Sequence, residues 1–212
     1  PNEFLADPGL EPVVTATVEA GARGRGRTLD WSLAGFRGVA RNDILFVSVR
    51  GAANAGYFQN VGETRRTGLE AAGTLHAGRF SLVGQASWID ARYESEFTVE
   101  SPNHSAADAQ GDIAVSPGDR IPAVPRFTAK LRADWRITGR VRIGAFARAA
   151  SRQFARGDES NDDSRGPVPG YGIAGIDAST ALSGGWALTA RVDNVFDRHY
   201  ATFGLLGRNY FR

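Results

Sequence analysis

The feature that most constrains the fold of this chain is an alternation of side-chain type with a period of two residues. Between residues 127 and 137, apolar side chains occupy every second position and charged or polar ones the positions between. Because successive side chains of a β-strand point to opposite faces, such a segment is apolar on one face and charged on the other. The same alternation recurs near residue 80, from 141 to 149 and from 186 to 193. The sequence therefore predicts long, two-faced strands.

The connections between these strands alternate in length. Short turns that contain glycine are expected at 24–26, 77–79, 138–140 and 183–185, because glycine readily adopts the positive φ of a tight hairpin. Longer polar connections are expected at 50–56, 98–124 and 155–168. These limits predict eight strands, and a ninth could begin near the C-terminus; the eight cover residues 11–23, 27–49, 57–76, 80–97, 125–137, 140–154, 169–182 and 186–196.

Strict alternation of short and long connections is typical of outer-membrane barrels, which have short turns on the periplasmic side and long loops outside. Several of the expected strands exceed the ~9–11 residues that cross a bilayer, whereas no apolar run reaches the ~20 residues of a membrane-spanning helix. We predict an all-β fold, an antiparallel transmembrane β-barrel segment. A soluble β-sandwich also shows alternating strands, and eight strands can close into a small barrel.

Composition excludes several classes of function. There are no cysteines, which excludes a disulfide framework and a thiolate metal site. The net charge is only +2 and the arginines are spread along the chain, so no nucleic-acid partner is expected. We find no catalytic constellation and expect neither an enzyme nor a cofactor. The three histidines lack the spacing of a zinc site. The acidic run 158–163 is interpreted as a solvated loop and not as a calcium-binding loop. We therefore predict no metal site.

Three short motifs resemble those of the TonB-dependent outer-membrane receptor family. One lies at 60–70, one at 118–126 and one at 191–200, in the order that the family has them. Glycine suits a bulge or a close backbone approach, proline suits the entrance of a strand, and asparagine and aspartate bond to nearby backbone at a strand end. The residues that match the family motifs are Asn60, Gly62, Gly68, Glu70, Gly118, Pro122, Pro125, Asn194, Phe196, Asp197 and Tyr200.

The resemblance implies that residues 1–212 form the C-terminal portion of a barrel of about 22 strands, with the plug domain and the final strand absent. It also implies a location in the outer membrane of a Gram-negative bacterium, surrounded by lipid. The expected function is active import of a scarce nutrient, a ferric siderophore or a similar metal complex, powered by the TonB complex through the absent N-terminal plug. Two alternatives are a small eight-stranded outer-membrane barrel with a structural or adhesive role, and a soluble β-sandwich binding module.

Two groups of residues are candidates for contact with substrate or plug. Loops on a rigid scaffold determine specificity, so the loop residues His104, Arg120, Phe154 and Arg156 are candidate substrate contacts. The second group is expected to face the barrel lumen. Its cations either attract an anionic substrate or pair with the plug or with the acidic groups Asp134, Asp193, Glu70 and Glu19, as any large barrel with a polar interior requires. The lumen-facing group comprises Lys130, Arg132, Asp134, Arg136, Arg142, Arg148 and Arg191.

Overall fold

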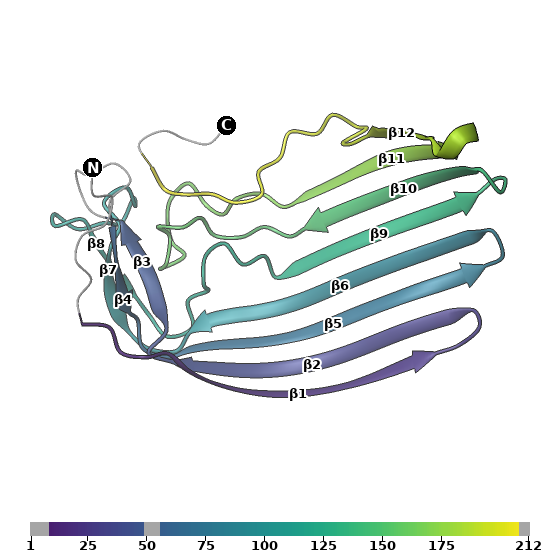
Figure 1. The fold of residues 1–212 in the computed structure, drawn as a ribbon. Helices are drawn as coiled ribbons and strands as arrows, with labels where there is room; N and C mark the ends of the chain where they lie inside the picture. Colours follow the sequence, from purple (N-terminus) through teal and green to yellow (C-terminus); the bar gives the residue numbers. More distant parts are fainter. Residues whose placement is uncertain (1–8, 49–55, 208–212) are drawn as a thin grey trace.

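A computed structural model describes residues 9–48 and 56–207 of the chain. Eight long strands form a single antiparallel sheet in which neighbours follow one another in the order β1-β2-β5-β6-β9-β10-β11-β12 (Figure 1). The strands are β1 (Val14–Arg25), β2 (Leu29–Arg41), β5 (Thr64–Ala77), β6 (Phe80–Tyr93), β9 (Phe127–Arg136), β10 (Val141–Ala150), β11 (Tyr171–Ala181) and β12 (Ala187–Val192). The prediction of an antiparallel all-β sheet is confirmed.

The two ends of the sheet differ. Short turns join the strands at one end; between β5 and β6, Ala77 pairs with Phe80, and Gly78 in the two-residue turn has a φ of 60°. The last of these turns contains the short helix η1 (Ser183–Gly185). At the other end lie the long connections and two small hairpins, β3 (Ile44–Ser48) with β4 (Gly56–Asn60), and β7 (Phe97–Glu100) with β8 (Asp112–Val115) (Figure 1). The predicted asymmetry of the connections is therefore present.

The register of the sheet separates apolar from polar side chains. Cross-strand partners share a face, so Leu131, Ala147 and Ala174 lie in one row of the apolar face. That face is open to the surroundings, since 49% of Leu131 and 54% of Trp135 is exposed. A soluble protein rarely exposes a continuous apolar surface of this extent. Further exposed members of this face are Val18, Leu33, Leu69, Ile143, Ile176 and Leu188.

The hydrophobic core lies among the loop hairpins and not under the sheet. Tyr93, at the end of β6, is 1% exposed and its ring meets that of Phe97 edge-on at 5.0 Å between centroids. The hairpins β3–β4 and β7–β8 enclose this core together with the end of β6, which fixes the long connections against one another. The core residues are Val47, Val61, Tyr93, Val99, Ile113 and Val115.

Two alternatives from the sequence do not fit this arrangement. The long strands form one layer, whereas a β-sandwich needs two packed sheets. Within the described ranges, β1 and β12 are the edges of the sheet and do not pair with each other, so the eight strands do not close into a small barrel. No helix among the described residues is both long and apolar enough to cross a membrane.

Several strand limits were predicted wrongly. The segment 27–49 divides into β2 and β3 at Asn42, whose φ is 54°, and 57–76 divides into β4 and β5 at Gly62, whose φ is 77°. The strand expected at 80–97 ends at Tyr93, and the connection 98–124 contains most of a hairpin. Strands β10 and β12 end earlier than expected, at Ala150 and Val192. The connection expected at 50–56 and the ninth strand near the C-terminus lie almost entirely outside the described residues.

Candidate functional site

The polar face of the sheet has a network of charges centred on Arg132. Asp134, Gly144 and Asp177 lie in one row across β9, β10 and β11. The Arg132 guanidinium donates to Asp134 at 2.7 and 2.8 Å and reaches across β10 to donate to Asp177 at 2.9 and 3.1 Å. A Cβ on Gly144 would lie 2.6 Å from Arg132 Nη2 and 2.8 Å from Asp177 Oδ1. A side chain at residue 144 would therefore displace this pair from its path over the middle strand.

The remaining charges of this face are only partly neutralised. Arg142 lies 3.6 Å from Asp134, and Arg191 lies 2.8 Å from Asp193 and stacks on the Phe146 ring at 4.3 Å from its centroid. Within the described part of the chain, Lys130 and Arg136 take part in no ion pair. The sequence correctly named Asp134 and Asp193 as partners of the arginines. It missed Asp177, and the described ion pairs include neither Glu19 nor Glu70.

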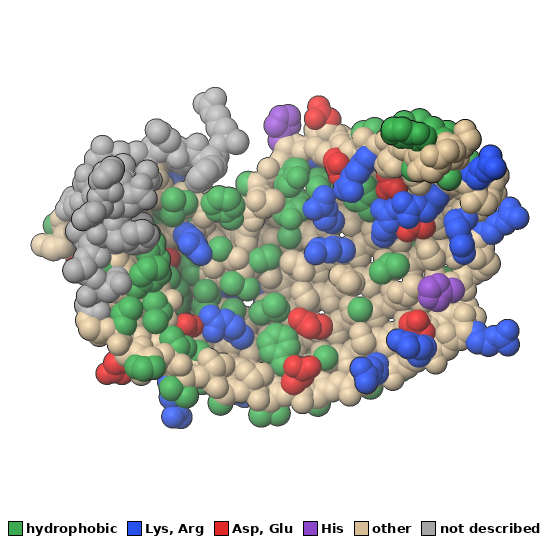
Figure 2. Space-filling view, in the orientation of Figure 1, with side chains coloured by type: hydrophobic (Ala, Val, Ile, Leu, Met, Phe, Trp, Pro, Cys, Tyr) green, Lys and Arg blue, Asp and Glu red, His purple; other side chains and the backbone are tan. Residues whose placement is uncertain are grey.

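This face is hollowed between β2 and β9. A depression of about 400 Å³ is lined by polar and small side chains, among them Ser32, Glu70, Gln85 and Lys130. Figure 2 shows this face, where basic side chains are densest toward the end with the short turns and acidic side chains lie scattered among them. The candidate cations Lys130, Arg132, Arg136, Arg142, Arg148 and Arg191 outnumber Asp134, Asp177 and Asp193, so the part of the face formed by β9 to β12 is positive.

Two long connections, 98–124 and 155–168, contact each other beyond the end of the sheet. Asn161 accepts a hydrogen bond from the Arg120 backbone N–H at 2.6 Å and donates to the Arg120 carbonyl at 2.9 Å. The Ser101 hydroxyl donates to the Gly157 carbonyl at 2.6 Å, and the Ser105 backbone N–H donates to Asp163 at 2.9 Å. The sequence suggested that both connections lie outside the membrane, but it did not indicate this contact.

The structure places the four candidate substrate contacts in two settings. Arg120 lies over the Phe154 ring, 5.9 Å from its centroid, and burial together with nearby Arg126 lowers the Arg120 pKa. Arg156 is exposed, and its backbone pairs with Gly204 and Leu206. The His104 side chain is buried against the 155–168 loop. Arg120, Phe154 and Arg156 thus remain candidates for direct contact, and His104 could reach a substrate only after the loops move apart.

Three of the four acidic groups in the run 158–163 are buried, namely Asp158, Glu159 and Asp163, which contradicts its interpretation as a solvated run. Arg165 donates to Asp163 at 2.7 Å, and this bond lowers the Asp163 pKa well below its usual range. Burial raises the pKa of Glu159, although a hydrogen bond from the Gly157 backbone N–H at 3.1 Å partly offsets the effect. Buried carboxylates of this kind need fixed partners, so the loop has a defined internal structure.

The motif residues have identifiable structural roles. The Asn60 side chain donates to the carbonyls of Asn42 and Glu11 at 2.7 and 3.0 Å, which joins the end of β4 to the end of β2. After β12, Asn194 has a φ of 49° and both donates to and accepts from the Arg198 backbone, at 3.0 and 3.1 Å. Pro122 and Pro125 precede β9, as predicted for strand-entrance positions. These motifs therefore shape strand ends.

Comparison with known proteins identifies the family. The family model described as TonB dependent receptor-like, beta-barrel, matches residues 1–195. The chain belongs to the TonB-dependent receptor β-barrel family. As a member of that family it is an outer-membrane β-barrel protein and not an enzyme. A search of curated proteins found no sequence match.

Solved receptor structures show the same arrangement of strands. The copper transporter OprC is 18% identical with a TM-score of 0.66, and the match covers 91% of this chain and 27% of OprC. The siderophore receptor PiuA from Acinetobacter baumannii is 17% identical with a TM-score of 0.66, covering 92% and 26%. A mutant of the ferric enterobactin receptor PfeA from Pseudomonas aeruginosa is 24% identical with a TM-score of 0.63, covering 90% and 26%. The chain thus spans about a quarter of these receptors, and their likeness to it shows the fold.

Proposed function

We propose that this chain forms the C-terminal part of the barrel of an importer that takes up an iron chelate of the ferric siderophore class. Energy for uptake would come from the TonB complex acting on an N-terminal plug domain. The proposal rests on membership of the receptor family and on the siderophore receptors among its structural neighbours. In this proposal the polar face lines the lumen, and the contacting loops 98–124 and 155–168 lie on the outer surface.

The observation that best supports an anionic chelate is the positive polar face. This face has six candidate cations and three carboxylates in β9 to β12 and the residue after β12. Lys130 and Arg136 have no carboxylate within ion-pair distance in the described ranges. A concave surface with one excess charge attracts ligands of the opposite sign and raises their local concentration. Arg120 on Phe154 adds a cation and an aromatic surface at the loop end, a combination that suits a planar anionic group.

A copper ion is the main competing substrate, because OprC is among the structural neighbours. The chain has no methionine and no cysteine, and these soft ligands are the ones that select copper(I). Any copper ligands that this chain supplied would therefore have to be histidines or carboxylates. This composition favours a chelate over a free soft metal ion.

Binding by the full-length gene product in detergent tests the proposal. We expect tryptophan fluorescence to change on addition of ferric enterobactin or another anionic ferric siderophore, and not on addition of cobalamin. Double substitution of Lys130 and Arg136 by glutamine should slow association at low salt by roughly tenfold, since steering acts on the association rate. Arg27→Gln is the matched control, because this exposed arginine lies in the turn between β1 and β2, at the other edge of the sheet from β9 to β12. Binding of cobalamin or copper in preference to every ferric siderophore would overturn the proposal.

A further inference from the structure

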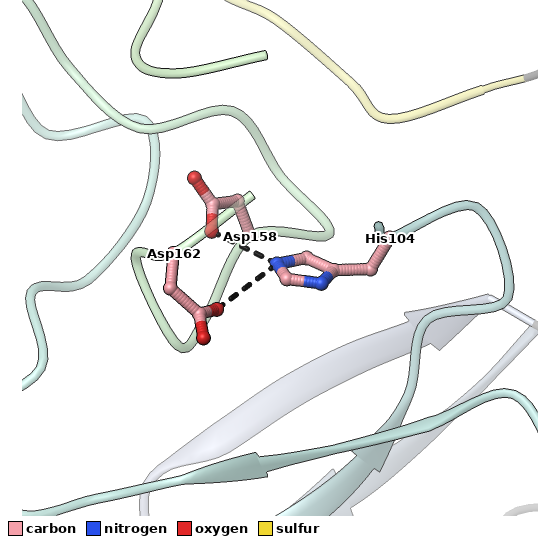
Figure 3. A group of neighbouring side chains, drawn as sticks. All are labelled: His104, Asp158 and Asp162. Atoms are coloured by element: carbon pink, nitrogen blue, oxygen red, sulfur yellow. Dashed lines mark hydrogen bonds and ion pairs between the residues drawn. The ribbon is translucent and has the colours of Figure 1, made fainter. Parts of the chain in front are cut away.

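The contact between the two long loops contains a buried group of metal-binding side chains. His104 comes from the connection after β7, and Asp158 and Asp162 come from the connection between β10 and β11 (Figure 3). Their nearest side-chain ligand atoms all lie within 4.8 Å of one another. The His104 side chain is 0% exposed and that of Asp158 1% exposed, whereas that of Asp162 is 63% exposed. The group therefore opens to solvent only on the Asp162 side.

Hydrogen bonding leaves one buried oxygen of this group without a partner among the described residues. The Ala106 backbone N–H donates to His104 Nδ1 at 3.1 Å, so the single proton of the neutral ring is on Nε2. That one proton is surrounded by Asp158 Oδ1 at 3.1 Å, Ser160 Oγ at 3.3 Å and Asp162 Oδ1 at 3.5 Å from Nε2. Asp158 Oδ1 also accepts from the Asp163 backbone N–H at 3.1 Å, and Asp162 Oδ1 accepts from the Ser160 hydroxyl at 2.5 Å. The other oxygen of Asp158, Oδ2, is buried without any hydrogen-bond partner among the described residues. Leaving a buried carboxylate oxygen unpaired costs free energy.

The distances suit a small divalent ion. Ligands about 2.0–2.2 Å from a tetrahedral ion lie roughly 3.3–3.6 Å from one another, and the His104 Nε2 separations of 3.1–3.5 Å fall close to that range. Imidazole with carboxylates suits zinc and its neighbours among the transition metals, whereas calcium takes ~6–8 oxygen ligands. Rotation about the last side-chain bond of Asp158, a torsion with a broad minimum, would present both oxygens to the ion.

We propose that His104, Asp158 and Asp162 form a divalent cation site of the zinc class that fastens the 98–124 loop to the 155–168 loop. The ion is a resident of the loops and not the transported cargo, because two of its three ligands are buried. A water held by the Ser160 hydroxyl takes the fourth position. Two carboxylates balance the ion's charge, so the site is neutral with a neutral imidazole. This proposal does not depend on which substrate the receptor imports.

Coordination has a defined effect on the histidine. The ion takes the Nε2 lone pair, the ring proton moves to Nδ1, and the Ala106 backbone N–H must turn from Nδ1 to another acceptor. Binding thus shifts the segment around Ala106 while it joins the two loops. Because ligands on two segments are fixed at once, the ion stabilises the folded loops by an amount that grows with the logarithm of its concentration over its dissociation constant.

The test uses the untagged full-length gene product, purified in detergent, stripped with a chelator and titrated with zinc chloride in a calorimeter. We expect the parent protein to bind one zinc ion at this site. In His104→Gln, Asp158→Asn and Asp162→Asn, that ion should no longer bind, or its affinity should fall at least 100-fold. His76→Gln, which removes an exposed histidine at the short-turn end, and Asp108→Asn, which removes an exposed loop carboxylate, should leave it unchanged. Zinc should also slow proteolytic cleavage of both loops in the parent protein and not in Asp162→Asn.

Asp162→Asn tests for the zinc site even if the variants at the buried residues His104 and Asp158 fail to fold, because the Asp162 side chain is largely exposed. If the parent protein and Asp162→Asn bind the same number of zinc ions with the same affinity, the site does not exist and the group is only a hydrogen-bonded contact. Calcium binding at these residues in place of zinc would also overturn the assignment, because the imidazole would then have no role as a ligand.

Discussion

Replacing Gly68 by alanine tests whether this motif glycine is required by the close approach of neighbouring strands. A Cβ at residue 68 would lie 2.5 Å from Phe36 Cζ and 2.9 Å from the Trp88 carbonyl oxygen. The Phe36 ring can turn aside, but the backbone carbonyl belongs to β6 and cannot move without disturbing the sheet. Overpacking of this kind costs about 1–3 kcal/mol, and we expect Gly68→Ala to lower the free energy of unfolding by that amount.

The matched control is Gly73→Ala in the same strand, where the nearest atom to a new Cβ is the Asp30 carbonyl oxygen at an ordinary 3.5 Å. That change should be neutral or stabilise by about 0.4–1 kcal/mol, because alanine restricts the unfolded chain. The assay is urea unfolding of the full-length gene product in detergent, followed by tryptophan fluorescence. Adding Phe36→Ala to Gly68→Ala should recover little of the loss, because the clash with the Trp88 carbonyl oxygen remains. Equal stability of Gly68→Ala and Gly73→Ala would refute the steric argument.

Two further predictions concern the apolar face and the loop end. Leu131→Arg should destabilise the membrane-inserted protein by about 2–4 kcal/mol, because the side chain faces lipid. Ser32→Arg, on the polar face beside Glu70, is the control and should be tolerated. Similar unfolding of both variants would show that the two faces of the sheet are assigned wrongly. Asp43→Asn should cost about 1–3 kcal/mol at pH 7 by removing bonds from Thr64 at 2.6 Å and Arg66 at 3.0 Å. Burial alone would raise the Asp43 pKa, but these bonds lower it below 3.8. The bonds therefore contribute to the free energy of unfolding above pH 3.8, and this contribution is lost as the pH falls through the lower folded-state pKa. The difference between parent and variant should therefore shrink in acid, and a pH-independent difference would contradict the assignment.

The sequence predicted the sheet because each strand is a local pattern. Side-chain alternation such as that of 127–137 depends only on strand geometry, and Gly78 marks its turn directly. The breaks at Asn42 and Gly62 were missed because alternation continues on both sides of them, while the change of direction depends on the φ of a single residue in each. The hairpin within 98–124 was missed because its two strands are only four residues long.

The candidate site was predictable only in part, because its contacts join distant segments. Lumen-facing charges could be chosen from alternation, but the pairing of Arg132 with Asp177, 45 residues away, requires the register of three strands. His104 and Asp158 are 54 residues apart, so a search for ligand spacing within one segment could not associate them. Loop hairpins bring these residues together, and their packing is not encoded in any local period.

The bond from Arg132 across Gly144 to Asp177 depends on the alignment of three neighbouring strands. A slip of β10 by one residue would place Ile143 or Ala145 under the guanidinium in place of Gly144 and would also turn the charged side chains of β10 toward lipid. A slip of β11 by one residue would replace Asp177 with Ile176 or Ala178 in that row. The pair therefore requires three consecutive strands in the correct order and alignment, so its free energy counts toward the native sheet and not toward the shifted ones.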